Sequence, residues 1–139
     1  MASRANPALK PRHRVLIVDD EESTRLLLAR TLGKELDVES QLAGTCEQAL
    51  RLAANYVYDA ILLDLLMPGR GGLGVLDEIR AATPNARTPV IIVSVVTDPA
   101  TMANCLASGA NAYHTKPIRR AELIATVKAQ LAGRSKIRG

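Results

Sequence analysis

The chain has no tryptophan, no phenylalanine and only three tyrosines. So few aromatic rings leave no surface on which successive bases stack, which argues against binding of single-stranded nucleic acid. Apolar runs are short as well. The longest candidate, Pro89 to Val96, is far below the roughly 20 residues that span a membrane, and it contains Ser94. We therefore expect no attachment to a membrane through a spanning helix.

Cysteine is scarce, and no secretory signal is visible at the start of the chain. Cys46 and Cys105 are the two cysteines, and they show no spacing typical of metal ligands. Residues 1–14 are polar and basic and contain no apolar segment of the kind found in signal peptides. A reduced, cytoplasmic setting is the simplest interpretation.

Basic residues are concentrated at the two ends of the 139-residue chain. Residues 1–14 carry four basic residues and no acid, and residues 132–139 carry three and no acid, so the part between them has a net charge of −3. The length fits one domain. We predict a basic N-terminal tail at 1–13, one domain at 14–131, and a basic C-terminal tail or the start of a linker at 132–139. Short basic ends commonly serve solubility, and a nucleic-acid role of the tails stays open as an alternative. We assign no nucleic-acid binding to the domain itself.

Apolar or β-branched runs alternate with helical patterns along the whole domain. Strands are expected at 15–18, 37–43, 60–63, 90–93 and 112–115, and helices at 23–32, 46–55, 73–82, 99–108 and 119–131. Gly33 is the expected stop of the first helix. Thr45, which with Gln48 resembles a capping box, is the expected cap of the second helix, and Asp98 is the expected cap of the fourth. This alternation predicts an α/β fold with a parallel sheet covered on both faces. The flavodoxin-like, doubly wound order 2-1-3-4-5 is the best match.

Three acidic residues follow two of the expected strands. Asp19 and Asp20 come after the run at 15–18, and Asp64 comes after the run at 60–63. In the predicted order these strands are neighbours, and their carboxyl ends lie at the switch point where ligands bind. Carboxylates that close repel each other unless a cation intervenes, and Mg²⁺ prefers oxygen ligands of this kind. The sequence thus predicts a Mg²⁺ site.

Three further polar side chains are expected at the same edge of the sheet. Ser94 ends the fourth strand, Tyr113 lies in the fifth, and Lys116 follows the fifth. Hydroxyl and ammonium groups beside a metal-bound carboxylate suit the binding of a phosphoryl group. One of the carboxylates would then be the nucleophile that forms an acyl phosphate.

These residues lie in four short motifs, which resemble those of the receiver domain of two-component response regulators, of which the chemotaxis regulators are examples. The resemblance covers about residues 14 to 131. It depends on the order and strand-end position of four segments: Val18-Asp19-Asp20-Glu21, Leu63-Asp64-Leu65-Leu66-Met67-Pro68-Gly69, Ser94, and Tyr113-His114-Thr115-Lys116-Pro117.

The resemblance implies a role for each acidic residue. Asp64 occupies the position of the phosphoacceptor aspartate. Asp19 and Asp20 match the acidic pair that holds Mg²⁺ directly or through water, and the backbone carbonyl of Leu66 would be a further ligand.

The remaining motif residues match the part of the family that responds to phosphorylation. Lys116 corresponds to the lysine that pairs with the phosphoryl group, and Ser94 to the switch hydroxyl. Tyr113 corresponds to the aromatic residue that moves inward when this hydroxyl engages phosphate. The Lys116–Pro117 bond matches a peptide that is typically cis in the family.

The resemblance also implies a function and partners. The chain would be a signalling switch, not a turnover enzyme, and would receive a phosphoryl group from a sensor histidine kinase or a phosphotransfer protein. Such partners dock near the first helix, around Thr24, Arg25 and Leu28. The response would change the face of the fourth helix, fifth strand and fifth helix, which acts on an output domain or effector. Homodimerisation there on phosphorylation is open, as is whether the chain stands alone.

Three positions depart from the family pattern. Val95 follows the switch hydroxyl, where a small residue is usual, and is expected to narrow access to Asp64. Leu66 and Val96 are apolar at positions that influence dephosphorylation, which predicts a slow loss of phosphate. Val95 also leaves open a phosphate-independent interaction module. A hydrolase of the haloacid dehalogenase type is set aside, because Leu66 stands where those enzymes need a second acid.

Overall fold

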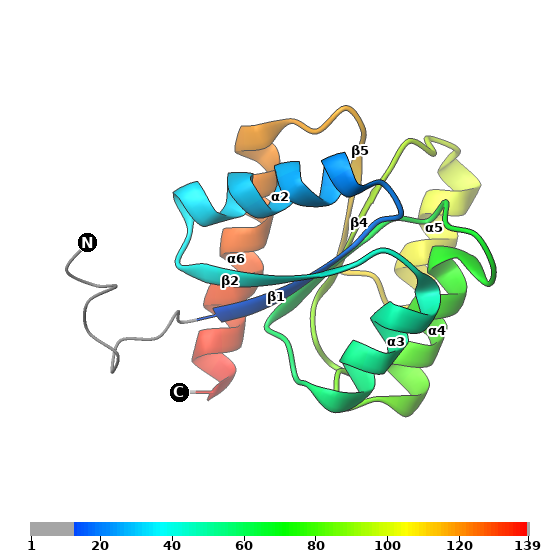
Figure 1. Cartoon of the computed structure of the whole chain (residues 1–139), viewed down its shortest axis with the longest axis horizontal. Coiled ribbons are helices and arrows are strands. Elements are labelled where there is room, and N and C mark those ends of the chain that lie inside the picture. The colour runs from blue at the N-terminus through cyan, green and yellow to red at the C-terminus, as the bar shows by residue number, and fades with distance from the viewer. Residues whose placement is uncertain (1–12, 139) are drawn as a thin grey trace.

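The computed structural model of the chain describes residues 13–138, in which strands and helices alternate (Figure 1). The strands are β1 (His13–Val18), β2 (Val38–Ala43), β3 (Ala60–Leu63), β4 (Val90–Ser94) and β5 (Ala112–Thr115). The helices are α2 (Glu22–Glu35), α3 (Cys46–Asn55), α4 (Gly71–Ala82), α5 (Pro99–Ala107) and α6 (Arg120–Arg138).

The five strands form one parallel sheet in the order β2-β1-β3-β4-β5. The predicted flavodoxin-like fold is therefore confirmed. The register sets Val18, the last residue of β1, beside Leu63, the last residue of β3. As a result, the residues that follow these two strands begin at the same level of the sheet.

Helices cover both faces of the sheet. Figure 1 shows α2 and α6 on one face and α3, α4 and α5 on the other. Alternate residues of β1 divide between the two cores: Leu16 and Val18 pack toward α3 and α4, and Val15 and Ile17 pack toward α2 and α6. Every residue of β3 is buried. This burial explains why the central strands are continuous apolar runs, since both of their faces are covered.

Two of the expected helix starts are confirmed by hydrogen bonds. The Thr45 hydroxyl accepts from the N–H of Gln48 at 3.0 Å, which caps α3. The Asp98 carboxylate accepts from the N–H of Thr101 at 3.2 Å, which caps α5. These bonds satisfy backbone donors that a helix start otherwise leaves open.

Two of the expected helix ends are wrong. Gly33 does not stop the first helix, because α2 continues to Glu35 before the chain turns toward β2. The last helix does not end at Leu131 but continues to Arg138, although Leu131 is the last buried residue among positions 120–133. The buried stripe that indicated this helix therefore did not reveal where the helix ends. The predicted N-terminal tail lies outside the described residues except for His13, which begins β1.

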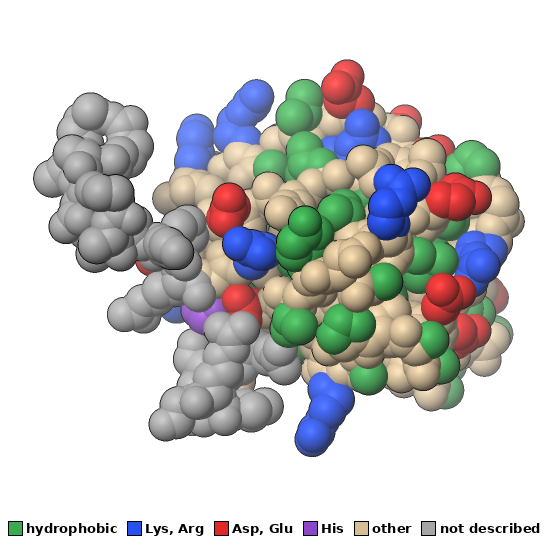
Figure 2. All heavy atoms as spheres, turned by 60° about the horizontal axis from the view of Figure 1, so that its bottom comes forward, with side chains coloured by type: hydrophobic (Ala, Val, Ile, Leu, Met, Phe, Trp, Pro, Cys, Tyr) green, Lys and Arg blue, Asp and Glu red, His purple; other side chains and the backbone are tan. Residues whose placement is uncertain are grey.

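No helix within residues 13–138 combines the length and the apolar character needed to cross a membrane. The face drawn in Figure 2 carries charged side chains of both signs, interspersed with apolar ones. Neither charge forms a continuous patch on that face.

Asn85, in the connection before β4, is completely buried. It joins two loops at the end of the sheet where the strands begin, opposite the end that carries Asp19, Asp20 and Asp64. Its side-chain oxygen accepts from the N–H of Tyr58 at 2.8 Å and from the Thr88 hydroxyl at 2.9 Å. Its amide nitrogen donates to the carbonyls of Ala53 and Tyr56, both at 2.7 Å. All of its hydrogen-bonding capacity is used, so this amide fixes how the chain enters β3.

We expect Asn85→Ala to lower the free energy of unfolding by about 3 kcal/mol, because it leaves several buried polar groups without a partner. Chemical denaturation would measure the loss. Asn55→Ala is the matched control, since Asn55 is exposed and donates one bond to the Arg51 carbonyl. The control should change stability by no more than about 0.5 kcal/mol. An equal effect of the two substitutions would contradict the assigned role of Asn85.

Candidate functional site

Backbone hydrogen bonds continue the sheet by one residue past the strand ends. The N–H of Asp19 donates to the Ala43 carbonyl at 3.1 Å, and that of Asp64 donates to the Val18 carbonyl at 3.0 Å. The N–H of Lys116 donates to the Ser94 carbonyl at 2.8 Å. The backbone of these polar residues is thus held by the sheet itself, with no flexible loop in between.

Three carboxylates meet at this edge. Each of Asp19, Asp20 and Asp64 offers an oxygen that lies within 4.8 Å of the other two. Asp19 and Asp64 are buried, at 1% and 6% exposure, whereas Asp20 is exposed. The structure brings together the three acids that the strand pattern predicted.

Lys116 offsets part of this negative charge. Its ammonium nitrogen lies 2.8 Å from Asp19 Oδ2 and 3.5 Å from Asp64 Oδ2. Three carboxylates and one ammonium group carry a formal charge of −2. A hard divalent cation would balance that charge, and oxygen donors are the ligands that Mg²⁺ prefers. The donor set therefore fits Mg²⁺.

The carboxylates differ in how many hydrogen bonds their oxygens accept. Asp19 Oδ1 accepts from the N–H of Glu21 at 2.9 Å, and its Oδ2 accepts from Lys116. Asp20 makes no side-chain hydrogen bond to any residue between 13 and 138. Asp20 is thus the acid with both oxygens free.

Burial dominates the protonation of Asp64. Desolvation raises the pKa of this carboxyl, and the N–H of Leu66 and the charge of Lys116 offset the rise only in part. Burial alone would lower the pKa of Lys116, but its hydrogen bond to Asp19 and the charge of Asp64 outweigh that effect, so the pKa is raised. Keeping Asp64 ionised in the folded state therefore costs free energy, and a bound cation would reduce that cost.

Ser94 and Tyr113 both contact the loop between β4 and α5. Ser94 is completely buried, and its hydroxyl accepts from the N–H of Val96 at 3.3 Å. The Tyr113 hydroxyl donates to the Val96 carbonyl at 2.6 Å. The Lys116–Pro117 peptide is cis, as the resemblance implied. One loop residue thus connects the two side chains that were expected to act together.

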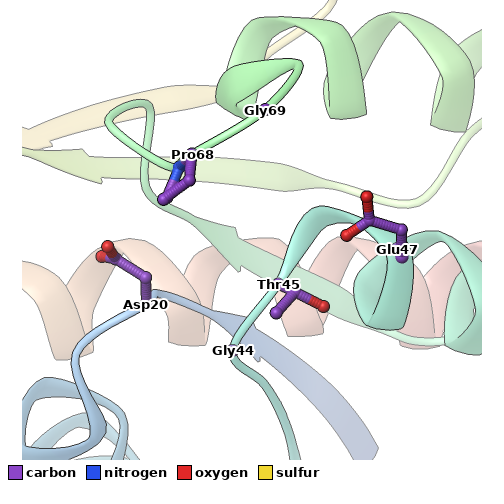
Figure 3. Close-up of a pocket in the computed structure, with 6 residues that line it drawn as sticks. All are labelled: Asp20, Gly44, Thr45, Glu47, Pro68 and Gly69. Carbon is purple, nitrogen blue, oxygen red and sulfur yellow. The ribbon is translucent and has the colours of Figure 1, made fainter.

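A cavity of about 300 Å³ adjoins the acidic cluster. Figure 3 shows Asp20 pointing toward Pro68 of the β3–α4 loop, with Glu47 of α3 at the other side. Gly44, Thr45 and Gly69 complete the lining. The acidic cluster is thus open to solvent on the side of Asp20.

Two of the apolar residues that depart from the family pattern lie at the surface. Leu66 is 55% exposed and Val95 is 56% exposed. Neither side chain is buried against Asp64. Their effect on access to the acid remains a prediction, as does the ligand role of the Leu66 carbonyl.

One residue of the expected docking surface is misplaced. Leu28 is buried at 2% exposure in the core between α2 and the sheet. Thr24 and Arg25 are half-buried, and the exposed apolar side chains of α2 are those of Leu26 and Leu27. A partner that docks on this helix would therefore meet Leu26 and Leu27.

Two residues contact the backbone of the acidic residues in a way that the sequence analysis missed. A Cβ on Gly72 would lie 2.2 Å from the carbonyl oxygen of Asp64, so only glycine fits there. Its place at the start of α4, beside Gly71, was a usable signal. Arg25 was expected only in the docking surface of the first helix, yet its side chain donates to the Asp19 carbonyl. No sequence pattern indicates that contact.

Comparison with known proteins agrees with this geometry. A model of the response regulator receiver domain matches residues 15–128. The sensory/regulatory protein RpfC of Xanthomonas campestris pv. campestris (strain 8004) is 36% identical over 130 residues, which are 88% of this chain and 18% of RpfC. The DNA-binding response regulator MtrA of Mycolicibacterium smegmatis is 34% identical over 120 residues, 86% of this chain and 51% of MtrA. The chain thus spans about half or less of these relatives.

A solved structure that shares the fold contains a magnesium ion. It is the receiver domain of a sensor histidine kinase from Pseudomonas aeruginosa PAO1, with a magnesium ion coordinated in its active-site cleft. The superposition has a TM-score of 0.78 at 30% identity and covers 86% of this chain and 98% of that one. Because the family model spans most of the chain and the strand order agrees, the chain belongs to the response regulator receiver domain family of two-component signalling.

Proposed function

We propose that this chain is a phosphorylation-controlled switch in which Asp64 accepts a phosphoryl group from a phosphohistidine. The observation that carries the proposal is the buried Asp64 carboxylate, placed within 3.5 Å of Lys116 and beside two further acids. The donor would be a sensor histidine kinase or a phosphotransfer protein.

In the proposed transfer, a carboxylate oxygen of Asp64 attacks the phosphorus in line. The P–N bond breaks, its electron pair returns to the imidazole, and an acyl phosphate forms on Asp64. Lys116, already between Asp19 and Asp64, is placed to bind a phosphoryl oxygen. The side chains of Asp19, Asp20 and Asp64, with the Leu66 carbonyl, would hold Mg²⁺. When bound, this ion offsets the negative charge that gathers at the transfer.

The proposed response passes through Val96. If the Ser94 hydroxyl turns to the phosphoryl group, it gives up its contact with the Val96 N–H, and Tyr113 is bonded to the carbonyl of that same residue. The β4–α5 loop then shifts, and with it the face of α5, β5 and α6. In energetic terms, the added charge biases a surface that has two arrangements.

The altered face would act on an output domain, an effector protein or a second copy of the chain. MtrA is described as a DNA-binding response regulator, and this chain spans half of its length. A longer regulator with a separate output domain is consistent with that coverage. We assign no nucleic-acid binding to the receiver domain itself.

Asp64→Asn should abolish labelling by acetyl phosphate in the presence of Mg²⁺, because the nucleophilic oxygen is lost. The measurement is the mass of the intact protein or the incorporation of radiolabel. Asp77→Asn is the matched control, since Asp77 is an exposed acid on α4. It should label like the wild type. Labelling retained by Asp64→Asn would refute the assignment, and a wild type that neither labels nor responds to beryllofluoride would favour a phosphate-independent module.

The raised pKa of Asp64 predicts a dependence of stability on pH. Because folding disfavours the ionised form of Asp64, ionisation of this carboxyl lowers the stability of the fold. This loss of stability is absent below the ordinary pKa of 3.8 and grows as the pH rises through the pKa of the folded state. Without Mg²⁺, Asp64→Asn should therefore melt above the wild type at pH 7, and the difference should vanish in acid. Added Mg²⁺ should raise the melting temperature of the wild type more than that of Asp64→Asn, because a ligand stabilises only the protein that binds it. Identical melting curves at pH 7 would contradict the prediction.

Apolar side chains at Leu66 and Val96 predict slow hydrolysis of the phosphorylated form, because neither can orient an attacking water. We expect a half-life of minutes or longer, measured from the decay of label. Leu66→Asn should shorten it about tenfold, which is the effect of one well-placed hydrogen bond. Leu27→Asn, a change of similar size on exposed α2, should leave it unchanged. A wild-type half-life of seconds would show that these two positions do not limit hydrolysis.

A further inference from the structure

Arg25 reaches from α2 back to the end of β1. Its guanidinium nitrogen Nη1 donates to the main-chain carbonyl of Asp19 at 2.6 Å, and the side chain is half-buried. The carbonyl it binds belongs to the peptide between Asp19 and Asp20. A cationic side chain thus holds the backbone that joins two of the three acids.

Gly44 provides the space for this guanidinium. A Cβ on Gly44 would lie 2.8 Å from Nη1, 3.2 Å from Cζ and 3.5 Å from Nη2 of Arg25. The guanidinium therefore packs against the backbone where β2 ends. Gly44 also lines the cavity beside Asp20 (Figure 3). The contact between Arg25 and Gly44 thus forms part of the support of the acidic cluster.

With this bond, every hydrogen-bonding group of Asp19 is engaged. Its N–H donates to the Ala43 carbonyl, and its own carbonyl accepts from Arg25. Its two carboxylate oxygens accept from the N–H of Glu21 and from Lys116. Arg25 is the only one of these partners that acts on the peptide leading to Asp20, whose side chain has no such support from residues 13–138.

We propose that Arg25 is a positioning residue for the metal site, holding the Asp19–Asp20 peptide so that both carboxylates face Asp64. This inference rests on the proposed binding of Mg²⁺. A guanidinium suits the task because its planar group packs flat while it donates in a fixed direction, which an ammonium group does not.

Removal of the Arg25 side chain should change the Mg²⁺ affinity in opposite directions, depending on whether Arg25 acts by positioning the acids or only by its charge. A positive side chain near a cation site repels the cation, so its removal would tighten binding if charge were its only effect. Loss of the backbone contact would instead loosen the Asp19–Asp20 pair and weaken binding. The direction of the change in Mg²⁺ affinity therefore separates the two effects.

The test is calorimetric titration of Mg²⁺ into the full chain at pH 7. We expect Arg25→Ala to weaken binding about tenfold, the lower end of the loss found for groups that orient metal ligands. Arg30→Ala is the matched control, since it removes the same charge from an exposed position on the same helix. Arg30→Ala should leave the affinity within about twofold.

Gly44→Ala tests the same contact without removing charge. The added methyl group must displace the end of the Arg25 side chain, which is flexible enough to move, so the fold should be retained. We expect weaker Mg²⁺ binding here too, with melting temperatures recorded for each variant. An Arg25→Ala variant that binds Mg²⁺ as tightly as the wild type, or more tightly, would overturn the positioning role alone. A wild type that binds no Mg²⁺ would overturn the proposed metal-dependent function as well.

Discussion

Mutual repulsion among three carboxylates is the constraint on which this structure depends. Asp19, Asp20 and Asp64 each place a carboxylate oxygen within 4.8 Å of the other two, because the register of β1 and β3 brings the ends of these strands to the same level. Lys116 compensates one of the three charges, and the remaining charge makes the edge of the sheet a site for a divalent cation. The same repulsion explains why metal binding and phosphoryl transfer are expected to be linked. Without a cation, a phosphoryl group would add negative charge to a site that is already negative.

The rest of the fold holds this unfavourable arrangement in place. Apolar side chains on both faces of β1 and β3 pack into two separate cores, so the strands cannot slide or twist to move the acids apart. Hydrogen bonds continue past the strand ends, and Gly72 lets the start of α4 approach the Asp64 carbonyl closely. The resulting cost is visible in the raised pKa of Asp64, an acid that is held in its charged form against its desolvation. The buried charge that the proposed reaction needs at Asp64 thus lowers the stability of the fold.

Sequence reasoning succeeded where a local pattern has a single structural solution. Continuous apolar runs predicted buried parallel strands, and the side chains of Thr45 and Asp98 predicted helix starts that the hydrogen bonds confirm. It failed where a pattern has two solutions. Gly33 resembled a helix stop, but a glycine inside a helix costs only about 1 kcal/mol, and α2 continues through it. The family resemblance placed Leu28 in the docking surface of the first helix, but Leu28 lies on the face of α2 that packs on the sheet.

The sequence by itself determined the alternation of strands and helices along the chain and the identity of the acids, because strand periodicity and the position of a residue after a strand are local properties. Tertiary structure alone decided which side chains orient those acids. Arg25 meets the Asp19 carbonyl only because α2 folds back over the end of β1, and it fits there only because a glycine, Gly44, directly follows β2. Contacts of this kind depend on where three separate elements meet in space, and no spacing along the chain encodes that meeting.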